Sequence, residues 1–424
     1  MHENLSARHA RLLQSARRVR RYERGRPPRI LFVSTYPPTR CGIATFTNSL
    51  ISELSKLRGG DGGLGVARLV TPDDDITPTP NVAVIAAIDS PYWPEAVARS
   101  AEDYDVVWIQ HEFGIFEPKG SETIPALLSL VDKPVVTTFH TVLADPTPEQ
   151  SAIMDDLLSG SALSVVLSDS ARDRLLEVHE VDPDRLRVIP HGAGQFRLTQ
   201  SPDPQHPQIL TWGLLGPGKG IEWGIEAMAR LVQLRPRPHY VVAGATHPNV
   251  LRAEGPVYRD SLESLATDLG VGDMVNLEDA YLSPYRLEQL LSQSQIVLLP
   301  YDSTEQVTSG VLVEAIAAGK PVVATGFPHA IELLGGGAGT VVPHRDPDAI
   351  AAAVERYLTD PAALPAAQRA AARIRPQLLW SSVARRTDTV AREAVRRVQA
   401  PSRVVAFDSR AGQAIAESAS VVRN

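Results

Sequence analysis

The chain has very little cysteine and few aromatic residues. Of its 424 residues only Cys41 is a cysteine, and Phe, Trp and Tyr together make up 5%. A single cysteine excludes an internal disulfide framework and a zinc site made of several cysteines, and it is typical of a reducing compartment. No apolar run is long enough to span a membrane or to act as a secretory signal. We therefore expect a cytoplasmic protein.

Net charge narrows the classes of partner. The net charge of −7 and the isoelectric point near 5.9 lack the basic character of nucleic-acid-binding proteins, so we expect no nucleic-acid partner. The exception is a basic N-terminal extension at residues 1–28, which is rich in arginine. We interpret it as a frayed helix with a solvated face. The alternative is weak contact with a membrane surface or with a partner. The oligomeric state is not indicated.

Apolar strand patterns alternate with helical patterns in two separate stretches, which predicts two α/β domains. The first covers residues 29–196, and the second restarts the same alternation over 208–375. Between them, residues 197–207 are rich in Pro, Gln and Asp and are interpreted as a linker. After the second domain we expect a C-terminal helix at 376–399 that packs back on the first domain, and a flexible tail at 400–424.

One strand–loop–helix unit in the second half has the properties of a ligand site. The apolar run 296–300 predicts a buried strand, and Ser309 and Gly319 are suitable caps for the helix that follows a polar loop. The start of a helix favours a phosphate, because its N–H groups are free and its dipole is positive there. Glu314 lies about one turn further and can reach a neutral hydroxyl. A phosphate beside a hydroxyl indicates a nucleotide-type ligand.

A glycine-rich loop opens the second domain. It runs from Gly213 to Gly220 after the strand 209–212 and is not a Walker motif, because Lys219 is followed by Gly220. Lys219 can donate to a phosphate as a point charge, or it is a surface lysine in a turn. Tyr281, at the end of a later strand, either stacks on a base or packs on the domain.

Polar residues also follow strands of the first half. Gly42 ends a loop after the first strand and either admits a ligand or serves the turn. His111 and Glu112 directly follow one buried strand, and His140 ends another. Each histidine could simply satisfy backbone groups, but the carboxyl ends of strands in one sheet point toward one crevice. No third ligand at suitable spacing joins the two histidines, so we expect no metal site.

Taken in order, these motifs resemble the retaining glycosyltransferases of family 4. The resemblance covers roughly Arg29 to Val398 and is stronger in the second half. It implies an α/β fold of the GT-B type, with two Rossmann-like doubly wound domains facing across a cleft. The matching features are the loop 37–42, His111-Glu112, Thr138-Phe139-His140, Ile189-Pro190-His191-Gly192, Gly213 to Gly220, and Glu314 to Val323.

The resemblance implies transfer of a hexosyl unit, with retention of configuration, from a nucleotide-diphosphate sugar of the GDP-mannose or UDP-glucose type. The acceptor, a carbohydrate, lipid or small molecule, is unknown, and no cofactor is implied. Three groups of residues carry over. The catalytic group is His111, Lys219 and Gln306; the donor-binding group is Gly42, Gly213, Gly220, Ser309, Gly310, Glu314 and Tyr281; and Arg40, Glu112 and His140 lie near the sugar or the acceptor.

Two positions depart from the family pattern. Gln306 stands where the family commonly has a glutamate, and Leu214 stands where it often has an arginine. An amide can still bind sugar hydroxyls, and Arg40 or the backbone amides of 216–220 could replace the missing cation. The departures keep other readings open: a nucleotide-sugar epimerase or sugar phosphorylase on the same fold, or a non-catalytic nucleotide-sugar-binding protein.

Overall fold

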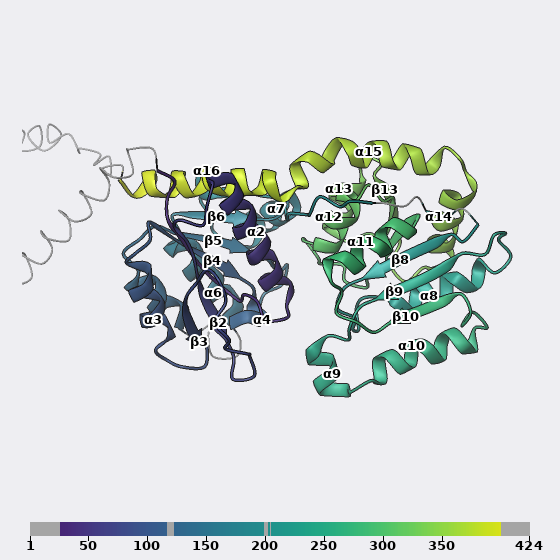
Figure 1. Cartoon of the computed structure of the whole chain (residues 1–424), viewed down its shortest axis with the longest axis horizontal. Coiled ribbons are helices and arrows are strands. Elements are labelled where there is room, and N and C mark those ends of the chain that lie inside the picture. Colours follow the sequence, from purple (N-terminus) through teal and green to yellow (C-terminus); the bar gives the residue numbers. More distant parts are fainter. Residues whose placement is uncertain (1–25, 117–122, 199–201, 204, 400–424) are drawn as a thin grey trace, which may run out of the picture.

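A computed structural model describes residues 26–116, 123–198, 202, 203 and 205–399. The chain forms two α/β domains that lie side by side, each built around a parallel sheet (Figure 1). The two predicted Rossmann-like domains are thereby confirmed. Most of the predicted basic extension, up to residue 25, and the predicted tail at 400–424 lie outside the described residues.

The first domain contains a seven-stranded sheet in the order β3-β2-β1-β4-β5-β6-β7. Its strands are β1 (Ile30–Ser34), β2 (Leu64–Val70), β3 (Val82–Ala87), β4 (Val106–His111), β5 (Val135–Phe139), β6 (Leu163–Val166) and β7 (Leu186–Val188). The helices between them are α2 (Gly42–Arg58), α3 (Trp93–Ala101), α4 (Phe113–Phe116), α5 (Ile124–Leu130), α6 (Pro148–Gly160) and α7 (Asp169–Val178), followed by the short 3-10 helix η2 (Pro183–Arg185).

The second domain contains a six-stranded sheet in the order β10-β9-β8-β11-β12-β13. Its strands are β8 (Gln208–Trp212), β9 (His239–Ala243), β10 (Val275–Glu278), β11 (Ile296–Leu299), β12 (Val322–Thr325) and β13 (Gly339–Val342). The helices are α8 (Ile221–Arg230), α9 (Pro248–Glu254), α10 (Val257–Asp268), α11 (Pro284–Gln293), α12 (Gly310–Ala317), α13 (Pro328–Leu334), α14 (Pro347–Thr359), α15 (Ala363–Leu378) and α16 (Trp380–Gln399).

The central strands of both sheets are buried on both faces, which explains why they read as continuous apolar runs. Along β1, Leu31 and Val33 enter one core while Ile30 and Phe32 enter the other. The strand order reverses between β1 and β4 and between β8 and β11, and ligands bind such sheets beyond the carboxyl ends of the strands at this point. The two crevices therefore mark where to look for the site.

The chain passes between the domains twice, and the two passages lie side by side. Ala193 donates its N–H to the carbonyl of Leu378 at 2.8 Å, and its own carbonyl accepts from the N–H of Trp380 at 3.0 Å. After this point α16 packs along α2 of the first domain, placing Val383 and Val390 in that core (Figure 1). The last helix therefore fastens the second half of the chain to the first.

A second set of contacts joins α7 to the loop that precedes α12. Ser168 donates to the carbonyl of Val307 at 2.6 Å, and Arg174 donates to the carbonyl of Glu305 at 2.6 Å. Glu332 of α13 accepts from the backbone N–H groups of Asp169 and Ser170 at 3.1 and 2.8 Å, so it caps the first turn of α7 from the other domain. The two domains therefore touch next to the ligand site predicted at α12.

Candidate functional site

The loop between β8 and α8 requires glycine at two places. Gly220 has a φ of 61°, and a Cβ atom there would lie 1.9 Å from the carbonyl oxygen of Pro300. Gly213 has a φ of 119°, and its carbonyl oxygen lies 1.7 Å from where a Cβ atom of Gly244 would stand. These close backbone contacts pack the loop against the ends of β9 and β11.

Lys219 lies at the carboxyl end of β11. Its Nζ atom is 4.4 Å from the centroid of the Tyr301 ring, within the range of a cation–π interaction. The Tyr301 ring stacks on Phe327 at 5.3 Å between centroids. The aromatic pair supports the ammonium group of a half-buried lysine without neutralising its charge, so Lys219 can still bind an anion.

The start of α12 offers fewer free amides than the sequence predicts. The Ser309 hydroxyl caps the helix by accepting from the N–H of Leu312 at 3.3 Å, and the Ser309 N–H donates to Nδ1 of His329 at 2.9 Å. Burial lowers the pKa of His329 to about 3, so the ring is neutral and can accept at Nδ1. The amides left for an anion are those of Gly310 and Val311.

Glu314 lies one turn into α12 and faces Trp212 at the end of β8. The indole Nε1–H donates to Oε2 of Glu314 at 3.3 Å. Burial raises the pKa of this carboxyl to about 7, although the hydrogen bond from Trp212 acts in the opposite direction. The group is therefore poised to ionise near neutral pH, and a ligand that donates hydrogen bonds to it would favour the ionised form.

His191 of the interdomain segment contacts the start of α12. Its Nδ1–H donates to the carbonyl of Gly192 at 2.8 Å, which leaves Nε2 without a proton. Both Nε2 and Cε1 lie 2.9 Å from the point where a Cβ atom of Gly310 would stand. The ring of His191 therefore leaves no room for a side chain at position 310 unless the ring moves.

The loop 37–42 of the first domain leads from β1 into α2. Cys41 caps α2, with its Sγ accepting from the N–H of Ala44 at 3.3 Å, and Gly42 is the first helical residue. No described atom lies within 4 Å of where a Cβ atom of Gly42 would stand, so packing within the chain does not demand glycine there. Arg40 is exposed. The roles assigned to Arg40 and Gly42 stay predictions.

His111 does not reach an open surface in this structure. Its side chain is fully buried, with ring centroids 4.9, 5.6 and 5.8 Å from those of Phe113, Phe116 and Phe139. Neither ring nitrogen has a hydrogen-bond partner among the described residues, and burial lowers the pKa of His111 to about 3. Contact between this ring and a sugar requires its aromatic surroundings to open, so its catalytic role stays a prediction.

The other strand-end residues of the first domain are held by neighbours. His140 is neutral, because burial, aided by His191 and His111, lowers its pKa to about 3, and its Nε2 pairs with Oε1 of Gln110 at 2.7 Å. Glu112 accepts from the hydroxyl of Thr141 at 2.5 Å. These contacts hold both side chains in place at the carboxyl ends of β4 and β5. Their proximity to the sugar stays a prediction.

Gln306 and Tyr281 each interact with the protein itself. The Gln306 Nε2 group donates to the carbonyl of Thr308 at 2.8 Å, which stiffens the loop before α12. The half-exposed Tyr281 places its hydroxyl 3.5 Å from that of Thr45 on α2, across the cleft. Tyr281 thus bridges the domains here, and stacking on a base remains a prediction.

Four residues that contact the predicted site were not singled out from the sequence. Trp212 ends a strand directly before Gly213, which is the same strand-end signal that marked His111. His191 lies in a motif that was quoted without a role being given to it. Tyr301 and His329 act on Lys219 and Ser309 from other segments, and no sequence spacing reveals such contacts.

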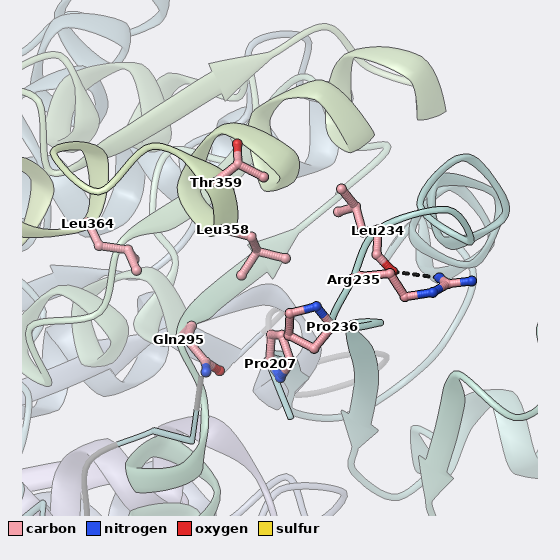
Figure 2. A pocket seen from close by; sticks show the side chains of 8 residues that line it. All are labelled: Pro207, Leu234, Arg235, Pro236, Gln295, Leu358, Thr359 and Leu364. Carbon is pink, nitrogen blue, oxygen red and sulfur yellow. Dashed lines mark hydrogen bonds between the residues drawn. The ribbon is translucent and has the colours of Figure 1, made fainter. Parts of the chain in front are cut away.

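A pocket elsewhere on the second domain is shown in Figure 2. Its lining includes Pro207, Pro236 and Gln295, which directly precede or lie near the starts of β8, β9 and β11. The pocket is therefore at the opposite end of the sheet from Lys219. Arg235, the one cation among the eight residues that line it, donates to the carbonyl of Leu234 at 2.7 Å.

Among the described helices, none is both long and apolar enough to cross a membrane.

Parts of the chain are similar in sequence to known glycosyltransferases. Residues 197–375 match the model of the family described as glycosyl transferases group 1. The D-inositol 3-phosphate glycosyltransferases of Frankia alni and Kineococcus radiotolerans are each 27% identical to the chain, over 219 and 299 residues. These regions are 49% and 62% of this chain and 52% and 67% of the two relatives. The chain therefore spans about half to two thirds of the length of these relatives.

Solved structures with low sequence identity share the fold. Sucrose-phosphate synthase of Thermosynechococcus elongatus has a TM-score of 0.68 at 18% identity, over 86% of this chain and 98% of that one. Anabaena Alr3699/HepE, in complex with UDP and glucose, has a TM-score of 0.66 at 17% identity, over 86% and 99%. The predicted GT-B fold is confirmed. Residues 197–375, which match the glycosyl transferases group 1 model, therefore correspond to the second domain of a two-domain GT-B fold.

Proposed function

We propose that the protein transfers a hexosyl unit from a nucleotide-diphosphate sugar to an acceptor hydroxyl. The observation that carries this proposal is the convergence of Lys219, the first amides of α12 and Glu314 at the carboxyl ends of β8 and β11. A cation and free amides suit a diphosphate, and a carboxylate suits the ribose hydroxyls beside it. The match of the same segment to a glycosyltransferase family supports this assignment.

In this proposal the leaving diphosphate gains charge as the anomeric bond breaks. Lys219 and the amides of Gly310 and Val311 would stabilise that charge as it forms. The contacts of Ser168 and Arg174 with the loop 302–308 hold the first domain against the site, which favours exclusion of water during transfer.

We further propose that the anomeric configuration is retained by departure and attack on the same face of the sugar. This route needs no nucleophile from the protein, which is compatible with Gln306 in the place of a glutamate, because an amide is a poor nucleophile. The diphosphate would assist deprotonation of the acceptor. The product anomer, read from the coupling constant of its anomeric proton by NMR, tests the point. An inverted product would contradict it.

The donor is proposed to be of the UDP-glucose or GDP-mannose type. UDP and glucose are present in a structure of the same fold, which supports the first of these. A thermal-shift screen of nucleotide sugars distinguishes them, since a ligand at about a hundred times its dissociation constant stabilises the folded state by roughly 2.7 kcal/mol. No stabilisation by any nucleotide sugar would count against the proposal.

Other activities on this fold give different products. An epimerase would change the donor sugar without an acceptor, a phosphorylase would require inorganic phosphate, and a binding protein would hold the donor without turnover. Release of nucleoside diphosphate that depends on an added acceptor favours transfer over all three. The N-terminal loop 37–42, with exposed Arg40, is the proposed acceptor side.

Glu314 predicts a pH dependence of donor binding. Ribose hydroxyls donate to a carboxylate, so binding favours the ionised form, and donor affinity should fall as the pH drops below the Glu314 pKa of about 7. We expect Glu314→Gln to bind the donor more weakly at high pH and to lose this dependence. Isothermal titration between pH 6 and 8 measures it, with Glu263→Gln, on the exposed face of α10, as the control in the same domain.

The same carboxyl also affects stability. The folded-state pKa of Glu314 lies above the ordinary 4.5. The contribution of this carboxyl to the free energy of unfolding is therefore favourable below pH 4.5 and is lost as the pH rises through 7. Unliganded Glu314→Gln should therefore gain thermal stability relative to the wild type as the pH rises from 5 to 8. In the titration of donor binding, an identical pH dependence of Glu314→Gln and the wild type would show that Glu314 does not contact the donor.

A further inference from the structure

The outer edge formed by α15 and α16 carries charge of one sign. Residues 363–399 contain eight arginines and two acidic residues, in a chain with a net charge of −7. Five of these arginines are exposed and have no acidic partner among the described residues. We call these five the arginine ridge: Arg369, Arg373, Arg385, Arg386 and Arg396.

Both acidic residues of this segment are already neutralised. Asp388 accepts from Arg58 at 2.6 Å and from Arg392 at 2.7 Å. Glu393 pairs with Arg187 and with Arg397. Because Asp388 and Glu393 are largely buried against the first domain, the outward face of the two helices presents cations alone.

Other exposed helices do not show this pattern. On α10, which follows the opposite edge of the molecule in Figure 1, the exposed charges are Asp260, Glu263 and Asp268, while Arg259 is buried. On α8, Arg230 is paired with Asp348. The run of unpaired arginines along α15 and α16 therefore distinguishes these helices from α8 and α10.

The shape of this edge suits a flat partner. Figure 1 shows α15 and α16 following one another along the same side of both domains. Laid end to end their residues span roughly 55 Å, at about 1.5 Å per helical residue. The one aromatic residue of the two helices, Trp380, packs inward against Phe46 at 5.0 Å between ring centroids.

The chain preceding the first domain starts beside the same edge. The carbonyl of Pro28 accepts from Arg58, the residue that also pairs with Asp388 of α16. The sequence before residue 28 is itself rich in arginine. Pro28, close to where the described part of the chain begins, therefore lies next to α16.

We propose that the arginine ridge docks the protein on an anionic lipid surface. A lipid surface is favoured over a nucleic acid, because the arginine ridge exposes no aromatic side chain for stacking on bases and its charges follow two consecutive helices along one side of both domains. Binding without apolar anchors is electrostatic, reversible and weakened by salt. This proposal does not depend on the proposed donor or on transfer.

Co-sedimentation with vesicles tests the proposal on the full chain. Vesicles of phosphatidylcholine mixed with phosphatidylglycerol should bind the wild type at low salt, and vesicles of phosphatidylcholine alone should not. The variant R373Q/R385Q/R386Q should bind about a hundredfold more weakly, at about fivefold for each arginine near the surface. Its thermal unfolding should be unchanged, because all three side chains are exposed.

A matched control removes as many positive charges elsewhere. R99Q/R230Q/R235Q changes exposed arginines on α3, at the end of α8 and in the loop that follows α8, and it should bind vesicles like the wild type. Equal loss in both variants, or no loss in either, would overturn the proposal, since binding would then depend on net charge or on the N-terminal segment. Binding of the wild type to duplex DNA but not to anionic vesicles would also overturn it.

Discussion

We expect Lys219→Ala to lower kcat by about a hundredfold to a thousandfold, the usual cost of removing one group that stabilises developing charge. Nζ of Lys219 is supported by the face of Tyr301, with no carboxylate partner among the described residues, so its charge is available to the leaving diphosphate. Donor affinity should fall by about tenfold, the scale of one lost charge-assisted hydrogen bond. Steady-state kinetics and isothermal titration with the chosen donor measure the two effects.

Two comparisons make this prediction specific. Lys219→Arg keeps the charge and its stacking on Tyr301 and should retain part of the activity. Lys56→Ala removes a surface lysine that pairs with Glu53 on α2 and should change neither quantity. Unchanged donor affinity in Lys219→Ala would show that the diphosphate does not bind at this loop.

The second large effect is expected from Gly220→Ala. A Cβ atom there would lie 1.9 Å from the carbonyl oxygen of Pro300, a rigid backbone atom, at a φ of 61°. The loop must shift to relieve the clash, which costs about 1–3 kcal/mol and moves Lys219. We expect a lower unfolding temperature together with a loss of donor binding comparable to that of Lys219→Ala.

Gly218→Ala is the matched control for this change. Gly218 lies in the same loop and also has a positive φ, 87°, but no described atom lies within 4 Å of where its Cβ would stand. It therefore shares the backbone strain without the clash. If Gly218→Ala and Gly220→Ala have the same effect on donor binding, close packing against Pro300 is not what positions the loop.

The elements that the sequence predicts well are those whose signal is local. The strand before Ser309, the cap at Ser309 and the glycines of the 213–220 loop follow from apolar runs, capping chemistry and turn chemistry, and the structure has each of them. The fold class follows from the alternation of the same signals. None of this needs knowledge of which segments meet in space.

What the sequence does not reveal depends on contacts between distant segments. The Ser309 N–H is occupied by His329, and Gly310 faces His191, although both residues appear only as ordinary histidines in the sequence. His111 is the last residue of β4 rather than the residue after it, and three phenylalanines enclose its ring, since a strand end can turn its last side chain into the core. Burial of this kind is decided by tertiary packing.

The most direct test of the proposed function is the release of nucleoside diphosphate from the donor that stabilises the protein most, with and without a panel of sugar, lipid and small-molecule acceptors. We predict release that rises with one class of acceptor in the wild type and falls at least about a hundredfold in Lys219→Ala. Donor binding with no acceptor-dependent release, or release that Lys219→Ala leaves unchanged, would contradict transfer at this site.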